Sequence, residues 1–197
     1  MIGRQRIITG TEALFAKAGI RSATMDDIAH HLGISKKTIY THFKNKEELV
    51  MTIVENNIAG YKEKVNMITS ESENIFTMIG ELTHSVIELS SGIFSLQKHD
   101  LLKYYANAWS LFQIFIDDVL LTSFDRLLHQ GMKEGLIRPE IKVTILVRMR
   151  LAQIQQVFDS LTYPSVCLNP LEVHEELLTH FIYGIATPKG REVWLES

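Results

Sequence analysis

Apolar residues recur at intervals of three and four positions along almost the whole chain, which is the spacing of one face of an α-helix. Gly and Pro are sparse, with 11 and 4 residues in a chain of 197, and no alternating run typical of strands persists. The sequence therefore predicts an all-α fold. Charged residues interrupt every apolar stretch well before the ~20 residues of a membrane span. The first residues lack the apolar core of a secretory signal, so we expect a cytoplasmic protein with no membrane contact.

The first fifty residues contain several closely spaced signals for helix starts. A periodic segment at residues 4–18 ends at Gly19, and three starts follow it, each with a side chain that can accept a hydrogen bond from a free backbone amide. The three starts are Thr24 with Asp27, which is a variant of the capping box, Ser35, and Asn45 with Glu48. These signals predict a three-helix head at residues 1–48 and a helical body at residues 49–197.

In the body, the periodicity predicts six further helices, joined at Gly and Pro residues such as Gly131, Gly135 and Pro139. The predicted helices cover residues 47–67, 75–90, 94–107, 108–130, 142–162 and 171–186.

Charge is distributed unevenly between the two parts. Residues 1–50 contain eight Lys and Arg against five Asp and Glu, a net charge of +3, although the whole chain carries −3. The remainder therefore carries −6. A basic head on an acidic body is typical of a protein whose head alone meets phosphate groups.

The short segment after Ser35 is amphipathic. On a helix, Ile39 and Phe43 lie together, and Lys37 and Thr41 point the opposite way. The flanks carry Lys36, Thr38, Tyr40 and His42. Such a helix can bury one face and turn the other into the major groove of DNA, as the second helix of a helix-turn-helix does. The alternative is an ordinary solvated helix face, because a short amphipathic helix is weak evidence by itself.

Residues 4–50, about a quarter of the chain, resemble the DNA-binding head of the TetR family, and the run from Ser35 to Leu49 is the most specific part of the match. The matching residues are Ile7-Ile8, Leu14-Phe15, Gly19, Thr24, Ile28-Ala29, Gly33-Ile34-Ser35, Thr38-Ile39-Tyr40, His42-Phe43 and Lys46-Glu47-Glu48-Leu49. Two positions depart from the family pattern. Lys37 stands where a small residue is common, and Gly10-Thr11 replaces the usual alanines.

The resemblance implies a role for each polar residue of this head. It assigns phosphate contacts to Thr24, Ser35, Tyr40, His42 and Lys46, and places Lys36, Lys37, Thr38 and Thr41 nearer the bases. It also implies a ligand-responsive transcriptional regulator, a repressor that a small molecule releases from its operator. The alternative is a DNA-binding architectural or interaction protein whose body senses no ligand.

Two apolar stripes near the C-terminus have helical spacing. Members of the family usually dimerise through their last two long helices, which implies a homodimer on a near-palindromic operator. Burial inside one chain is the other reading of both stripes. The first stripe is Val147, Leu151, Ile154, Phe158 and Leu161, and the second is Leu171, Leu178, Phe181 and Ile185.

Aromatic residues gather in the middle of the body. Tyr105, Trp109 and Phe112 are separated by four and three positions, so they can line one wall of a site for an apolar effector. Plain core is the alternative. Lys98 and Lys103 are the only cationic residues between positions 75 and 124, which disfavours a multiply charged anion.

No catalytic constellation is evident, so we expect no enzyme activity, no metal and no cofactor. His174 and His180 are six positions apart, which places them on different helix faces. Asp117 and Asp118 are adjacent and diverge by about 100° on a helix. Cys167 is the single cysteine, so it can form neither an intrachain disulfide nor a thiolate cluster.

Overall fold

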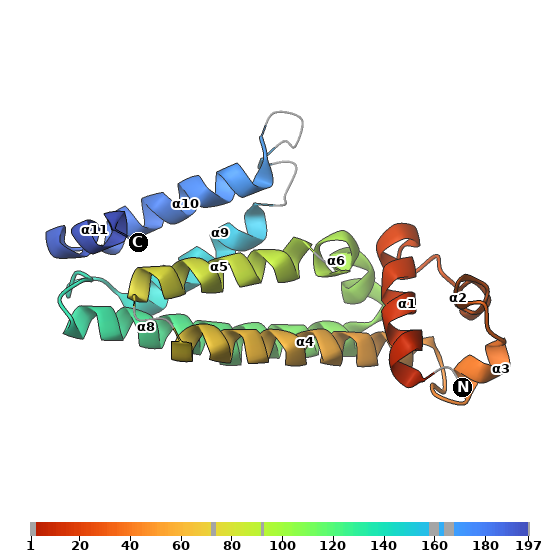
Figure 1. The fold of residues 1–197 in the computed structure, drawn as a ribbon. Coiled ribbons are helices and arrows are strands. Elements are labelled where there is room, and N and C mark those ends of the chain that lie inside the picture. Colours follow the sequence, from red (N-terminus) through yellow and green to blue (C-terminus); the bar gives the residue numbers. More distant parts are fainter. Residues whose placement is uncertain (1–2, 72–73, 92, 158–161, 164–167, 197) are drawn as a thin grey trace. The chain divides into compact units, whose positions relative to one another are not determined.

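The computed structural model describes residues 3–71, 74–91, 93–157, 162–163 and 168–196, and every named element in these ranges is helical (Figure 1). This confirms the all-α prediction. The helices are α1 (Arg4–Ala18), α2 (Met25–Leu32), α3 (Lys36–Tyr40), α4 (Lys46–Glu71), α5 (Ile75–Ser91), α6 (Ile93–Tyr104), α7 (Ala106–Phe115), the π-helix η1 (Ile116–Leu121), α8 (Thr122–Lys133), α9 (Val143–Gln156), α10 (Pro170–Ile185) and α11 (Pro188–Leu195).

The chain divides into two compact units. Residues up to 61 and residues 91–115 form the first, which contains α1 to α3, the start of α4, α6 and α7. Residues 62–90 and 116–197 form the second, which contains the end of α4, most of α5 and the helices from η1 onward. The functional boundary between residues 48 and 49 stays a prediction.

In the first unit, α1, α2 and α3 form the expected three-helix head. Their apolar faces supply its core, which includes Ile8, Phe15, Ile28, Ile39 and Phe43. Burying side chains of this kind stabilises the fold by about 1.5–3 kcal/mol each. The predicted capping residues Thr24 and Ser35 each accept a backbone N–H bond at the start of their helices.

Gly10, one of the two departures from the family pattern, has a packing role. A Cβ atom at this position would lie 2.2 Å from Cδ2 of Leu32. The glycine therefore lets α2 pack closely on α1, which offsets its low helix propensity.

The boundaries in the middle of the chain differ from the prediction. One helix was expected over residues 108–130, but this stretch contains most of α7, the π-helix η1 and most of α8. Gly131 was expected in a connection, yet it lies inside α8, where an added Cβ would meet Ile137 and Ile75 at 2.6 and 2.9 Å. The glycine serves close packing, and the chain turns instead at Gly135, whose φ of 71° is left-handed.

The first of the two apolar stripes is buried within a single chain. Val147, Leu151 and Ile154 on α9 are at most 5% exposed, as the core interpretation predicts, and Phe158 and Leu161 lie outside the described residues. In the second stripe Phe181 and Ile185 are buried, Leu178 is half-buried and Leu171 is exposed.

Helix α11 has no counterpart in the sequence prediction. It begins at Thr187, whose side chain accepts the amide N–H of Gly190 at 3.0 Å, and the Thr187 amide donates to the carbonyl of Leu136 at 2.9 Å. Near its end, the Trp194 ring lies edge-on to Phe76, with centroids 6.3 Å apart. This helix therefore closes one end of the second unit.

Gly190→Ala should destabilise the protein by about 2–4 kcal/mol, because the new Cβ would lie 2.0 Å from the backbone oxygen of Leu136, which has no flexible side chain to yield. Chemical denaturation measures the loss. Gly60→Ala is the matched control, since an added Cβ at this α4 position meets nothing within 4 Å. The control should raise stability by about 0.5–1 kcal/mol, and equal stability of the two variants would contradict the packing of α11.

None of the described helices is sufficiently long and apolar to cross a membrane.

Candidate nucleic-acid interface

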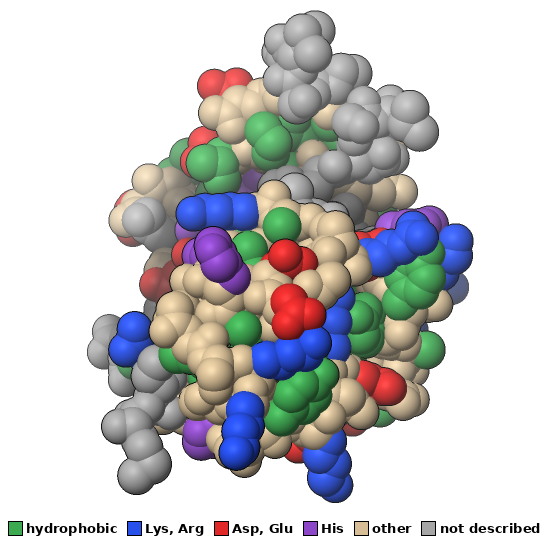
Figure 2. All heavy atoms as spheres, turned by 90° about the vertical axis from the view of Figure 1, so that its right-hand side faces the viewer, with side chains coloured by type: hydrophobic (Ala, Val, Ile, Leu, Met, Phe, Trp, Pro, Cys, Tyr) green, Lys and Arg blue, Asp and Glu red, His purple; other side chains and the backbone are tan. Residues whose placement is uncertain are grey.

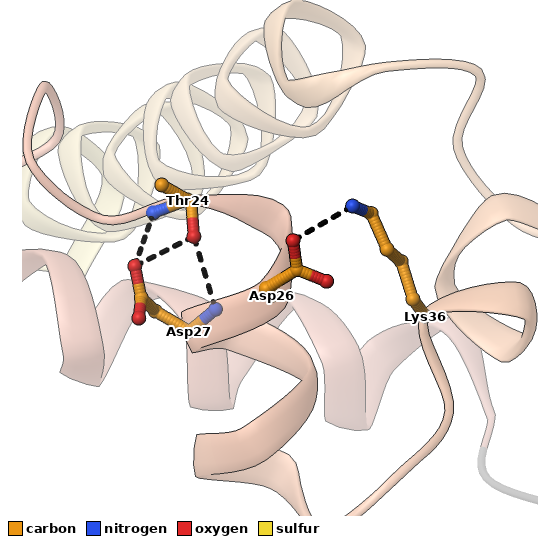
Figure 3. A network of polar contacts seen from close by, with 4 residues as sticks. All are labelled: Thr24, Asp26, Asp27 and Lys36. Atoms are coloured by element: carbon orange, nitrogen blue, oxygen red, sulfur yellow. Dashed lines mark hydrogen bonds and ion pairs between the residues drawn. The ribbon is translucent and has the colours of Figure 1, made fainter.

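Thr24 is locked at the start of α2 by a complete capping box with Asp27 (Figure 3). The Thr24 hydroxyl accepts the Asp27 amide N–H at 3.2 Å and donates to the Asp27 carboxylate at 2.6 Å, and the Thr24 amide donates to the same carboxylate at 2.8 Å. These bonds from Thr24 hold the pKa of the Asp27 carboxyl below its usual value. The predicted phosphate contact is thus an exposed side chain on a fixed helix start.

Helix α3 presents the two faces expected from its sequence. Ile39 and Phe43 are at most 1% exposed and anchor the helix on the head. Ser35 caps the helix by accepting the Thr38 amide N–H at 3.0 Å, and the two hydroxyls lie 2.8 Å apart. The Thr41 hydroxyl donates to the backbone oxygen of Thr38 at 2.6 Å. The short polar side chains of α3 therefore order the helix itself.

Lys37 and Tyr40 are exposed side chains on the outward face of α3. Tyr40 is 46% exposed, which is unusual for a large aromatic side chain, and Lys37 is also exposed. Among the described residues, no ion pair of Lys37 is found. His42 is half-buried, with its ring centroid 6.5 Å from that of Phe43. Lys37 and Tyr40 are consequently free to meet DNA without first breaking an ion pair.

Lys36 is held differently from Lys37. Its ammonium lies 2.8 Å from the carboxylate of Asp26, at the start of α2 (Figure 3). The hydrogen bond to Asp26 raises the pKa of Lys36. Both groups are exposed, so the pair is worth little to stability. It nevertheless orients Lys36, which must exchange this partner for a phosphate or base if it contacts DNA.

Lys46 is half-buried, and its side chain lies against the loop before α2. Its ammonium donates to the backbone oxygen of Arg21 at 3.3 Å and lies 5.7 Å from the centroid of the Phe15 ring. Partial burial lowers the pKa of Lys46, although the nearby Asp100 and Asp27 carboxylates oppose this shift. Its expected phosphate contact stays a prediction that requires the side chain to turn outward.

Sequence reasoning missed a contact between α6 and the head. The Arg21 amide donates to the Asp100 carboxylate at 3.2 Å, and the Arg21 guanidinium stacks 4.9 Å above the Tyr104 ring. Both partners belong to α6, some 80 residues further along the chain, and no local pattern marks such a contact. It connects the loop between α1 and α2 to the helix that precedes the aromatic cluster.

Basic side chains are spread across the face that includes the head rather than concentrated in one patch. Figure 2 shows Lys and Arg side chains set apart from one another, some toward the edge of the view and one beside the acidic groups near its centre. Arg4 is an additional cation that the sequence analysis did not select. Its guanidinium lies 5.0 Å from the Phe43 ring centroid, and it donates to Thr52 at 3.2 Å. Spaced cations suit separate phosphates along a DNA backbone.

The aromatic wall predicted for an effector, Tyr105, Trp109 and Phe112, lies in the first unit, and its role stays a prediction. The Trp109 and Phe112 rings contact each other, with centroids 5.5 Å apart, and the Trp109 amide donates to the Tyr105 carbonyl at 3.1 Å. Phe112 is 5% exposed, whereas Tyr105 and Trp109 are half-buried. Burial, with the Asp100 and Glu47 charges, raises the pKa of Tyr105 and keeps its phenol neutral at pH 7. Tyr105 lies between α6 and α7, so it stands at the end of this wall.

Comparison with known proteins places the head in a family. The model of the bacterial regulatory proteins of the tetR family matches residues 7–53. A longer match is the uncharacterized HTH-type transcriptional regulator YvaF of Bacillus subtilis, 31% identical over 162 residues, covering 79% of this chain and 80% of YvaF. The chain belongs to the TetR family. It is therefore a DNA-binding transcriptional regulator, and its helix-turn-helix comprises α2 and α3.

Solved structures of TetR-type regulators share the fold over nearly the whole chain. FadR from Bacillus subtilis in complex with stearoyl-CoA has a TM-score of 0.73 at 18% identity, covering 93% of this chain and all of that chain. The complex of SmeT with triclosan has a TM-score of 0.73 at 21% identity, covering 94% and 92%. At these identities the likeness establishes the fold alone. The helical body therefore has the same fold as the bodies of these regulators.

Proposed function

We propose that this TetR-family regulator is a repressor that binds a near-palindromic operator as a homodimer and leaves it when an apolar effector binds. The observation that carries the DNA-binding part is the outward face of α3, where Lys37 and exposed Tyr40 stand over a buried Ile39 and Phe43 anchor. Lysine ammonium groups reach phosphates or guanine edges, and a tyrosine hydroxyl donates to phosphate. Thr24, Ser35, Lys36, Thr38, Thr41, His42 and Lys46 complete the proposed DNA contacts.

The proposed effector site includes the wall formed by Tyr105, Trp109 and Phe112. Two half-buried aromatic side chains beside a buried one provide a broad apolar surface with few polar groups. Complexes of the similar regulators FadR and SmeT contain stearoyl-CoA and triclosan, and both ligands include large apolar parts. These observations support an apolar effector for this chain.

Linkage between effector and operator requires a structural connection, and α6 supplies one. Asp100 and Tyr104 contact Arg21 in the head, and Tyr105 begins the aromatic wall directly afterwards. A ligand that shifts this segment also shifts the loop before α2. Such a ligand lowers operator affinity by the same factor by which it binds the shifted conformation more tightly than the original one.

Replacing Trp109 with Ala tests the effector part. If Trp109 lines a site, the variant should lose less than about 2 kcal/mol of stability, while triclosan and long-chain acyl compounds that raise the melting temperature of the wild type should no longer do so. Phe115→Ala on the same helix is the control, because Phe115 is 2% exposed and its loss should cost about 3–5 kcal/mol. Thermal-shift screening followed by operator release in gel shifts measures both effects.

The result that would overturn the effector site is a Trp109→Ala variant as unstable as Phe115→Ala, together with no compound that stabilises the wild type. That combination would favour the second candidate, a DNA-binding architectural protein with a non-sensing body. Specific operator binding would survive in that case.

A further inference from the structure

Arg150 on α9 is a buried cation in the second unit. It has no solvent exposure and is the largest of the fully buried side chains in the described part of the molecule. Arginine is almost never fully buried unless a carboxylate or another acceptor pairs with it. Its position among apolar core residues therefore calls for a partner.

The contacts of Arg150 leave most of its hydrogen-bonding capacity unused. A guanidinium has five N–H donors. The hydrogen bond found for this group in the described part of the chain joins Nη2 to Nδ1 of His174 on α10, at a long 3.4 Å. Within the described ranges, Nε and Nη1 have no hydrogen-bond partner, and no carboxylate forms an ion pair with Arg150. The centroid of the Phe181 ring lies 5.7 Å from the guanidinium carbon, and a ring contact of this kind uses none of the N–H donors.

The side chains beside Arg150 do not supply the missing negative charge. His174 is 4% exposed, and burial, together with the charges of Arg150 and His84, lowers its pKa to about 4, so it is neutral at pH 7. Burial lowers the pKa of Arg150 only to about 10, so the guanidinium stays charged. Gln153, one turn further along α9, has a buried amide oxygen that also lacks a partner. Among the residues that the structure describes, the cluster thus holds one uncompensated positive charge and unpaired polar atoms.

We propose that the second unit contains an internal site for the carboxylate of an otherwise apolar molecule, bound by the free in-plane donors of Arg150 beside His174. The planar guanidinium matches the two oxygens of a carboxylate. A single cation balances a single negative charge, whereas a phosphate monoester would leave excess charge buried. This inference goes beyond the proposed function, because it adds an apolar monocarboxylic acid as a ligand of the second unit, whereas the proposed effector wall lies in the first unit.

The experiment compares acids with their uncharged methyl esters, using dodecanoate, hexadecanoate and 2-naphthoate at pH 7.5, with dodecyl phosphate as a dianionic probe. Titration calorimetry should give the wild type at least a tenfold higher affinity for one of the acids than for its ester, and no binding of the phosphate. Arg150→Met should reduce this preference to less than threefold. Arg148→Met, which removes the same charge from an exposed position on α9, should keep it.

Arg150→Lys is the second variant, needed if Arg150→Met does not fold. It keeps the charge and loses the planar donors, so the preference for the acid should fall at least threefold. No preference for any acid in the wild type, or an unchanged preference in the Arg150 variants, would overturn the inference. Tighter binding of dodecyl phosphate than of the acids would overturn the assignment to a carboxylate.

Operator release is measured separately, so that the two proposals can fail independently. An acid that binds through Arg150 without releasing the operator would contradict the effector role and leave the carboxylate site intact. Release by an uncharged apolar compound, with no acid preference in calorimetry, would contradict the carboxylate site and leave the proposed function intact.

Discussion

Replacing Lys37 with Ala and Tyr40 with Phe in the same chain should reduce specific operator affinity by at least ~100-fold. Each change removes a contact worth on the order of 1 kcal/mol or more, and a symmetric dimer loses it in both heads. About four such contacts correspond to about three powers of ten in affinity. Gel shifts with an operator fragment measure the loss.

The same double variant should fold normally, since both side chains are exposed on α3 and neither Ile39 nor Phe43 is touched. Circular dichroism checks this requirement. Lys62→Ala removes an exposed charge of the same kind from α4 and should leave operator binding nearly unchanged. Full-affinity binding by the double variant would remove the outward face of α3 from the interface.

Salt dependence provides an independent measure of the same interface. Each phosphate that a lysine or arginine neutralises contributes about −0.9 to the slope of log affinity against log salt concentration. Loss of Lys37 in both heads should therefore make the slope shallower by about 1.8 if Lys37 contacts phosphate. An unchanged slope with reduced affinity would instead place Lys37 on a base edge.

The helices of the head could be predicted closely from sequence, because their bounds and buried faces depend on residues that are near one another in the chain. Thr24 and Ser35 accept amide bonds three residues away, and both predicted caps form. The spacing of Ile39 and Phe43 likewise determines which face of α3 is buried. Sequence patterns within one helical turn therefore determine the helices of this part of the chain.

The rest of the molecule depends on contacts between distant residues, which local patterns cannot indicate. The Arg21 to Asp100 hydrogen bond spans 79 positions, and the close approach of Gly190 to Leu136 spans more than fifty. Lys36 and Lys46 look equivalent to Lys37 in sequence, yet Asp26 binds the first and the Arg21 carbonyl accepts from the second. The apolar stripe of Val147, Leu151 and Ile154 has the spacing of a dimer seam and is buried in one chain.

That burial changes which residues should test the proposed homodimer. Leu151 is 5% exposed in the single chain, so Leu151→Glu would disrupt folding and could not report on assembly. The opposite face of α9 has Ile145 and Met149 exposed at 60% and 41%, with exposed Ala152 one turn further along. These positions are four and three apart, so they form one continuous stripe on the helix. A stripe of this kind suits the seam of an isologous interface.

Ile145→Glu combined with Met149→Glu should convert the dimer into a folded monomer and reduce operator affinity at least ~100-fold. Two carboxylates in each copy would be buried without partners in the seam, at a cost of several kcal/mol, and an isolated head contacts only half of a palindromic site. Light scattering at micromolar concentration measures assembly, and gel shifts measure binding. Thr144→Glu is the control. Thr144 is exposed but lies on another side of α9, where it borders a shallow depression. Leu121 of η1 and Asp125 of α8 also line this depression. A wild type that is monomeric, or a double variant that stays dimeric while Thr144→Glu dissociates, would place the interface elsewhere on the molecule.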